Sequence, residues 1–112
     1  MEIKYFVQNF TLSDKDKKFL EDKIQKLTHF SNKIWEANVD LSYNPSHNKN
    51  QLFRAEINLR MPNKILRAVS MASHFEAAVI DIEKVLQRQL RRYKNFRFIR
   101  RRFAQKFLRR KK

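Results

Sequence analysis

The chain has 112 residues, with 26 Lys/Arg against 11 Asp/Glu, a formal net charge of +15, and neither cysteine nor glycine. Without cysteine there is no disulfide or thiolate metal site, and without glycine there is no P-loop, dinucleotide fingerprint or EF-hand. The length suits one small domain. An excess of positive charge of this size indicates a polyanionic partner: RNA, DNA or an anionic membrane.

The charge is concentrated at the C-terminal end. Residues 1–86 hold 13 Lys/Arg and all 11 acids, a net of +2, whereas residues 87–112 hold 13 Lys/Arg and no acid. We therefore expect an α/β domain over residues 1–95 and a basic, aromatic tail over residues 96–112. No apolar run approaches the roughly 20 residues that span a membrane. The start, MEIKYFVQNF, lacks the basic region and cleavage site of a signal peptide, so we expect a cytoplasmic protein.

The first elements along the chain are a strand and a helix. Residues 2–9 are rich in β-branched and aromatic side chains and predict a strand. The pattern then changes to a helical period, with Ser13 as N-cap. Leu20, Ile24 and Leu27 fall on one face of this predicted helix.

Three more strands follow. Residues 35–43 and 53–60 alternate between apolar and polar side chains, which is typical of half-buried strands. Pro62 and Asn63 predict a tight turn, since proline presets its φ and asparagine tolerates positive φ. Residues 64–72 predict a fourth strand, but their pattern does not indicate which face points inward.

The most regular element is a second helix that begins at a capping box, Ser73 to Glu76. Its apolar sector comprises Phe75, Val79, Ile82, Leu86, Leu90 and Tyr93. Its opposite side is basic and comprises Lys84, Arg88, Arg91 and Arg92. The order predicts an α+β fold, β-α-β-β-β-α, in which two helices pack on one face of a four-stranded sheet and the other face stays wet.

The second helix, SHFEAAVIDIEKVLQRQLRRYK, resembles that of the ribosome hibernation-promoting factors, a family that includes the ribosome-associated translation inhibitors. The residues that match the family pattern there are Ala77, Ala78, Leu86, Arg88, Gln89, Leu90, Arg92 and Lys94. In the first helix, DKIQKLTHF is similar to the family's Lys-x-x-Lys-Leu motif with its following aromatic: Lys23, Lys26, Leu27 and Phe30. The resemblance covers residues 1–95 in element order and length.

This resemblance implies a function on the ribosome. It implies binding to small-subunit rRNA in the mRNA/tRNA channel near the decoding centre, by a monomer that occludes the A and P sites and inhibits translation in idle ribosomes. It implies no catalysis. No cofactor, metal, small-molecule substrate or membrane partner is expected. The predicted rRNA-binding residues are Lys23, Lys26, Lys84, Arg88, Arg91, Arg92, Lys94, Arg97, Arg100, Arg101 and Arg102.

The sequence supports RNA contact more strongly in the second helix than in the first. From Arg88 onward the chain has no acid for i,i+4 pairing, so its bases favour RNA contact over a merely solvated surface. The lysines of the first helix alternate with acids, and only the resemblance assigns Lys23 and Lys26 to RNA.

The tail carries a second apolar stripe, rotated by about 90° from the stripe that ends at Tyr93. It consists of Phe96, Ile99, Phe103 and Phe107. We therefore expect either a helix break near Asn95 or a tail that becomes ordered only on a partner. Bases interleaved with aromatics suit RNA, with Phe96, Phe98 and Phe103 available for base stacking. They also suit a membrane-surface helix.

Two alternatives remain open: a general RNA-binding protein of the double-stranded-RNA type, and a membrane-surface protein anchored by its basic amphipathic tail. Trp35 and most phenylalanines are expected in the core. His29, His47 and His74 lack ligand-like spacing, and no nucleophile-base pair stands out, so neither a metal site nor an enzyme is expected.

Overall fold

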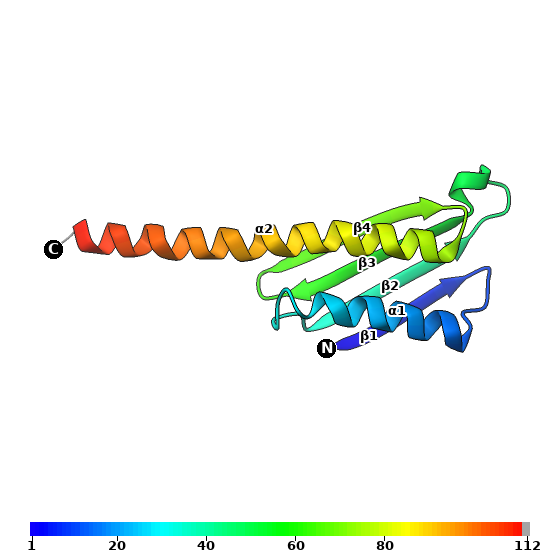
Figure 1. Cartoon of the computed structure of the whole chain (residues 1–112), viewed down its shortest axis with the longest axis horizontal. Helices are drawn as coiled ribbons and strands as arrows, with labels where there is room; N and C mark the ends of the chain where they lie inside the picture. The colour runs from blue at the N-terminus through cyan, green and yellow to red at the C-terminus, as the bar shows by residue number, and fades with distance from the viewer. Residues whose placement is uncertain (111–112) are drawn as a thin grey trace.

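The structure is a computed structural model that describes the backbone of residues 1–110 and the side chains of residues 1–93. The elements are β1 (Glu2–Gln8), α1 (Asp14–Leu27), β2 (Glu36–Tyr43), the short 3-10 helix η1 (Lys49–Gln51), β3 (Phe53–Met61), β4 (Lys64–Ala72) and α2 (Phe75–Arg110). Apart from the short helix η1, this is the predicted β-α-β-β-β-α order (Figure 1).

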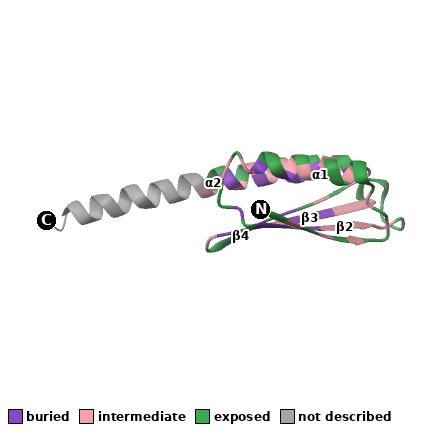
Figure 2. Ribbon diagram, turned by 90° about the horizontal axis from the view of Figure 1, so that it is seen from below, coloured by how far each residue is buried: buried purple, intermediate pink, exposed green. Residues whose placement is uncertain are grey.

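The four strands form one sheet in the order β1-β2-β3-β4. β1 runs parallel to β2, and the other neighbours are antiparallel. The parallel pair needs a crossover, and α1 supplies it. Both helices lie on the same face of the sheet, and no described segment covers the opposite face (Figure 2). The predicted α+β architecture is confirmed.

The core lies between the helices and the inner face of the sheet. It buries the predicted apolar faces of both helices, including Leu20, Ile24 and Leu27 of α1 and Ile82, Leu86 and Leu90 of α2. On the sheet it buries Val39, Leu41, Ile57 and Leu59. The structure also resolves the face of β4: Leu66 and Ala68 point inward, whereas Ile65, Val69 and Met71 are exposed. These exposed positions are why the sequence pattern of β4 was ambiguous.

Asparagine takes the place of glycine where the backbone turns left-handed. The residues with positive φ are Asn9, at 65°, and Asn63, at 61° in the predicted turn between β3 and β4.

The predicted N-cap of α1 is confirmed, because Ser13 Oγ accepts from the Asp16 N–H at 3.1 Å. At α2 the first helical residue is Phe75, one later than the capping box predicts, and the His74 carbonyl accepts from the Ala78 N–H.

α2 is a single 36-residue helix from Phe75 to Arg110, so the predicted alternative of a break near Asn95 is wrong. The helix extends beyond the end of the sheet (Figure 1). Tyr93 marks this end, because its hydroxyl reaches the Pro62 carbonyl of the β3–β4 turn at 3.5 Å. Beyond Tyr93 the helix no longer lies on the sheet. The change in direction of the apolar stripe in the tail therefore does not require a break in the helix. The side chains of that stripe lie outside the described residues.

Two aromatic residues expected in the core are not there. Trp35 is 60% exposed and Phe6 is 57% exposed. Phe6 alternates with the partly buried Tyr5 and Val7 along β1, which places it on the outer face of the sheet. Phe75, by contrast, is buried, with Phe10 and Phe19 packed around it.

In the described part of the chain, no helix has both the length and the hydropathy to cross a membrane.

Candidate nucleic-acid interface

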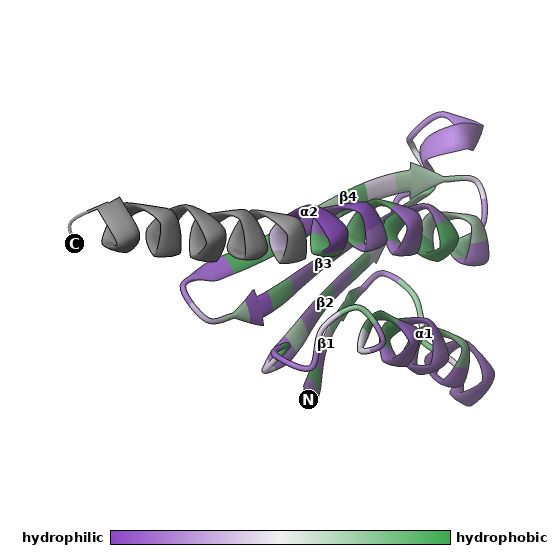
Figure 3. Ribbon diagram, turned by 60° about the vertical axis from the view of Figure 1, so that its left-hand side comes forward, coloured by the Kyte–Doolittle hydropathy of each residue, from purple (hydrophilic) through white to green (hydrophobic). Residues whose placement is uncertain are grey.

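The helix layer presents basic side chains on its outer surface. Lys84, Arg88, Arg91 and Arg92 of α2 are all exposed, on the side away from the core. Figure 3 shows hydrophilic residues along both helices of this layer. Within residues 1–93, no salt bridge joins these four bases to an acid. Their charge is therefore available to an external anion.

Arg91 is held in place by an aromatic ring. Its guanidinium carbon lies 5.3 Å from the ring centroid of Phe30, which follows α1 and packs against the core. Such a cation–π contact orients the guanidinium without neutralising it, so its N–H groups remain free to bind phosphate. The sequence showed Phe30 only as part of a motif and gave no sign of this contact.

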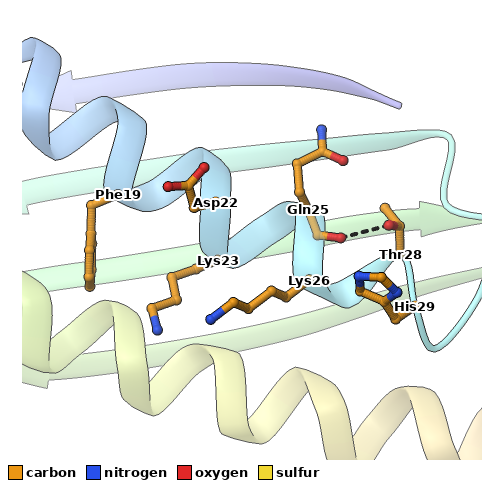
Figure 4. A pocket seen from close by; sticks show the side chains of 7 residues that line it. All are labelled: Phe19, Asp22, Lys23, Gln25, Lys26, Thr28 and His29. Atoms are coloured by element: carbon orange, nitrogen blue, oxygen red, sulfur yellow. Dashed lines mark hydrogen bonds between the residues drawn. The ribbon is translucent and has the colours of Figure 1, made fainter.

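A groove of about 560 Å³ runs beside the C-terminal half of α1 (Figure 4). Its lining comprises Phe19, Asp22, Lys23, Gln25, Lys26, Thr28 and His29. Figure 4 shows Lys23 and Lys26 projecting from α1 toward α2. His29, which was considered only as a metal ligand, lies in the turn after α1 and adds a further nitrogen to this groove.

The two lysines of the groove differ in their surroundings. Lys23 Nζ lies 3.5 Å from Glu83 Oε2 of α2, and the Lys23 side chain is only 23% exposed. Glu83 is held in turn by Gln87, whose amide nitrogen donates to Glu83 Oε1 at 3.0 Å. Lys26 is exposed and has no acidic partner among the described residues. Lys23 therefore connects the helices, while Lys26 is available to an anion.

The remaining predicted site residues belong to the distal part of α2. Lys94, Arg97, Arg100, Arg101 and Arg102 are in the same helix, and their side chains lie outside the described residues. Their assignment to RNA stays a prediction.

The family described as sigma 54 modulation protein / S30EA ribosomal protein matches residues 3–97 of the chain. The chain belongs to this family. This match confirms the family that the two helical motifs indicated, over the part of the chain that forms the sheet and the helix layer.

The S30EA-family chain is also similar to a curated protein. The ribosome hibernation promotion factor of Deinococcus radiodurans is 29% identical over 87 residues. These cover 78% of this chain but only 46% of that protein, so the chain spans about half the length of this curated relative.

Two solved structures share the fold. The protein Y N-terminal domain of Thermus thermophilus has a TM-score of 0.71 at 22% identity, over 83% of this chain and 99% of that one. A ribosomal subunit interface protein from Coxiella burnetii has a TM-score of 0.72 at 18% identity, over 85% and 99%.

On the outer face of the sheet in this S30EA-family chain, the basic side chains are paired with carboxylates, unlike the bases of the helix layer. The Glu36 carboxylate accepts from Lys4 Nζ at 2.8 Å and from Arg60 Nη1 at 3.3 Å. The hydrogen bond from Lys4 holds the Glu36 pKa below its usual value. Glu56 accepts from Asn58, Arg54 and Arg67, in that order of influence, and these contacts lower its pKa to about 2. Cations on this face are thus occupied by carboxylates, and the helix layer is the better surface for a polyanion.

Proposed function

We propose that the chain binds small-subunit rRNA in the mRNA/tRNA channel near the decoding centre, occludes the A and P sites, and inhibits translation in idle ribosomes. Membership of the S30EA family and the similarity to a ribosome hibernation promotion factor support this proposal. The observation that carries it is the basic surface of the helix layer, formed by Lys26, Arg88, Arg91 and Arg92. A ribosome-bound factor of this kind works in the cytoplasm and catalyses no reaction.

The surface suits RNA for physical reasons. Each lysine or arginine that neutralises a phosphate releases a condensed counterion, which drives binding and makes it dependent on salt. Arg91 is already oriented by Phe30, so less side-chain entropy is lost on binding. The cation-π contact leaves the planar guanidinium able to grip phosphate or stack on a base.

The tail acts in this proposal as a second RNA anchor. The backbone of α2 continues as one helix from the folded domain to Arg110. The residues from Arg97 to Arg110 therefore continue from the folded domain in the same helix. The domain determines where the protein binds, and the tail adds affinity.

Co-sedimentation with purified ribosomes and separated subunits tests the proposal, at near-physiological salt and with excess competitor RNA. Saturable binding of one copy per small subunit, lost when mRNA and tRNA fill the channel, is the expected result. Binding that competitor RNA abolishes, or that lacks subunit preference, would contradict it and favour a general RNA-binding role.

A pair of matched variants separates the site from overall charge. Replacing Arg88, Arg91 and Arg92 with glutamate should abolish ribosome binding without unfolding the domain, because all three are exposed. The control replaces three exposed lysines elsewhere, Lys15, Lys49 and Lys64, with glutamate and changes the net charge by the same amount. Equal losses in both variants would mean that only net charge matters.

A further inference from the structure

β4 is an edge strand, and half of its backbone groups point away from the sheet. In the order β1-β2-β3-β4 it has one neighbouring strand, β3. The two strands pair without interruption from the turn-closing pair, Met61 with Lys64, to Phe53 with Ala72. In an antiparallel strand, alternate residues turn their N–H and C=O groups away from the neighbour. Counted from the hydrogen-bonded closing pair, the outward residues of β4 include Ile65, Arg67 and Val69.

Most of these outward groups are unpaired in the described part of the chain. The Arg67 carbonyl accepts from Gln89 Nε2 of α2 at 2.9 Å. Among residues 1–93, no hydrogen bond reaches the outward groups of Ile65 or Val69. A carbonyl oxygen has two lone pairs, so the Arg67 carbonyl can accept a second hydrogen bond while Gln89 stays in place. A further strand can therefore pair along β4 without displacing α2.

β4 lacks the features that usually protect an edge strand. Natural edge strands are often short or bulged, or carry proline or lysine along their length. β4 has 9 residues in unbroken register, with no proline and with no lysine after its first residue, Lys64. Its internal cation, Arg67, is turned back toward β3, where it donates to Glu56 Oε1 at 2.9 Å. The edge is therefore open to another extended backbone.

On the outer face of the sheet, the side chains along this edge are mainly apolar. Ile65, Val69 and Met71 are 61%, 42% and 43% exposed. A strand added beside β4 places its own side chains directly opposite these, on the same face. Apolar side chains at those positions would remove all three from water.

On the other side of the edge lies α2, which follows β4 (Figure 1). Asp81 marks the flank of α2 that faces this edge, because its carboxylate accepts from Ser70 Oγ of β4 at 3.3 Å. At 100° per residue, Arg88 and Arg92 lie within about 20° of Asp81 around the helix, so both lean toward β4. Neither forms a salt bridge within residues 1–93. Acidic side chains on the helix side of an added strand would meet these two bases.

We propose that the β4 edge binds an extended segment of a partner protein in which apolar and acidic side chains alternate. The backbone of this segment pairs with Ile65, Arg67 and Val69, as in β-augmentation. Its apolar side chains lie on the outer face of the sheet, and its acidic side chains point toward Arg88 and Arg92. The alternation follows from the two-residue period of a strand.

A second copy of the chain fits this edge poorly. α2 reaches the outward carbonyl of Arg67 through Gln89, so pairing two copies edge to edge would bring α2 against α2. Arg88 and Arg92 would then face the same bases of the other copy. RNA can also meet these bases, but it has no apolar side chains to place against Ile65. A single extended segment meets neither obstacle.

Fluorescence anisotropy tests the proposal with a short labelled peptide that alternates valine and glutamate. The partner is the full chain, freed of nucleic acid, at near-physiological salt, and saturable binding of one peptide per chain is expected. Because the net charge of +15 attracts any acidic peptide, the control carries N-methyl groups on the amides that would donate to β4. It keeps the charge and should not bind. Equal binding of the two peptides, or of a valine–lysine peptide, would overturn the proposal.

Two variants at one position test the backbone pairing. Val69→Pro removes an outward N–H, and proline is tolerated at such positions of edge strands. It should weaken peptide binding by roughly fivefold or more, as expected for one lost hydrogen bond. Val69→Thr keeps the N–H and should bind the peptide like the unmodified chain. Equal affinities of these two variants, with circular dichroism showing both folded, would contradict the pairing.

The same two variants separate this proposal from the proposed ribosomal function. Val69 lies outside the basic surface assigned to RNA, so both variants should bind ribosomes like the unmodified chain. A failure of peptide binding therefore leaves the ribosomal proposal untouched, and the peptide titration needs no ribosomes.

Hydrogen exchange tests the site in the unmodified chain. The valine–glutamate peptide should slow exchange of the outward amides of Ile65, Arg67 and Val69. The amides of Leu66 and Ala68 already face β3 and should be unchanged. If the outward amides exchange at the same rate with and without the peptide, it does not bind at this edge. Protection that rises with protein concentration without peptide would make the occupant a second copy and overturn the proposal.

Discussion

Gln89 of α2 donates a hydrogen bond from its side-chain amide nitrogen to the backbone carbonyl oxygen of Arg67, at 2.9 Å. Arg67 lies in the edge strand β4, opposite Asn58. In an antiparallel ladder, hydrogen-bonded and non-hydrogen-bonded pairs alternate, and the pair that closes the turn, Met61 with Lys64, is hydrogen-bonded. Asn58 and Arg67 form the third pair beyond it and are therefore not hydrogen-bonded to each other, so the Arg67 carbonyl points away from β3. Gln89 therefore satisfies an otherwise open edge carbonyl and fixes α2 on β4. The same contact orients the basic side of α2.

Replacing Gln89 with alanine should lower the free energy of unfolding by about 1 kcal/mol, the usual net contribution of a single hydrogen bond. Urea unfolding followed by circular dichroism measures this change. Gln25→Ala, at an exposed position of α1, is the control for losing a glutamine side chain from a helix. If both variants unfold at the same urea concentration, the Gln89 contact does not stabilise the fold.

The low pKa of Glu56 predicts a pH-dependent contribution to stability. Its folded-state pKa of about 2 lies below the ordinary value of 4.5, because Asn58, Arg54 and Arg67 stabilise the ionised carboxylate. The stabilisation is therefore complete above about pH 4.5 and is lost as the pH falls toward about 2. Glu56→Gln should be less stable than the unmodified chain at neutral pH, and this difference should shrink through that interval.

Urea unfolding midpoints of both chains at a series of pH values provide the measurement for Glu56. Asp22→Asn, at an exposed position of α1, controls for the loss of one negative charge. A difference between Glu56→Gln and the unmodified chain that is constant over the whole series would show that packing, and not ionisation, accounts for it.

The contact of Phe30 with Arg91 should contribute to RNA affinity. Phe30→Leu keeps an apolar side chain but removes the ring that orients Arg91 before binding. The guanidinium must then be immobilised on binding, which costs about 0.5–1.5 kcal/mol, or roughly 2–10-fold in affinity. Equilibrium binding to small subunits measures this loss. Repeating the substitution in an Arg91→Ala background completes a double-mutant cycle. If Phe30→Leu has the same effect with and without Arg91, the ring does not act through the guanidinium.

The two lysines of the groove should respond differently to substitution. Lys26→Ala should reduce the slope of log K against log salt by about 0.7–0.9, the value for one phosphate contact. Lys23→Ala should mainly lower stability, because it leaves the Glu83 carboxylate, only 13% exposed, without its cation. Salt titrations of ribosome binding and urea unfolding of both variants distinguish these roles. A larger loss of salt slope for Lys23→Ala than for Lys26→Ala would reverse the assignment.

Removal of residues 96–112 should weaken ribosome binding and flatten its salt dependence, since most of the basic residues after Arg92 are lost. The truncated domain should still compete with mRNA and tRNA. Competition assays on the truncated chain and on the isolated tail peptide check this division. If only the tail peptide binds ribosomes, the domain does not determine the location.

The sequence alone determined the elements that depend on local patterns. Hydrophobic periodicity located both helices and their buried faces, and alternation located β2 and β3. Ser13 and Asn63 showed where a helix begins and where a turn lies. Two helical motifs were sufficient for the family. Each of these signals is contained in a few neighbouring residues, so it can be read without knowing what lies nearby in space.

The tertiary structure alone decided what depends on distant residues. Lys23 and Lys26 look alike in the sequence, and only the approach of Glu83 on α2 makes Lys23 a connection between helices. Phe6 is an aromatic that a composition argument places in the core, but both helices pack on the opposite face of the sheet and leave it exposed (Figure 2). The length of the sheet, which ends near Tyr93, lets α2 continue where its apolar stripe changes direction. Pairing across the sheet and packing between helices create these differences, and neither is encoded in the order of adjacent residues.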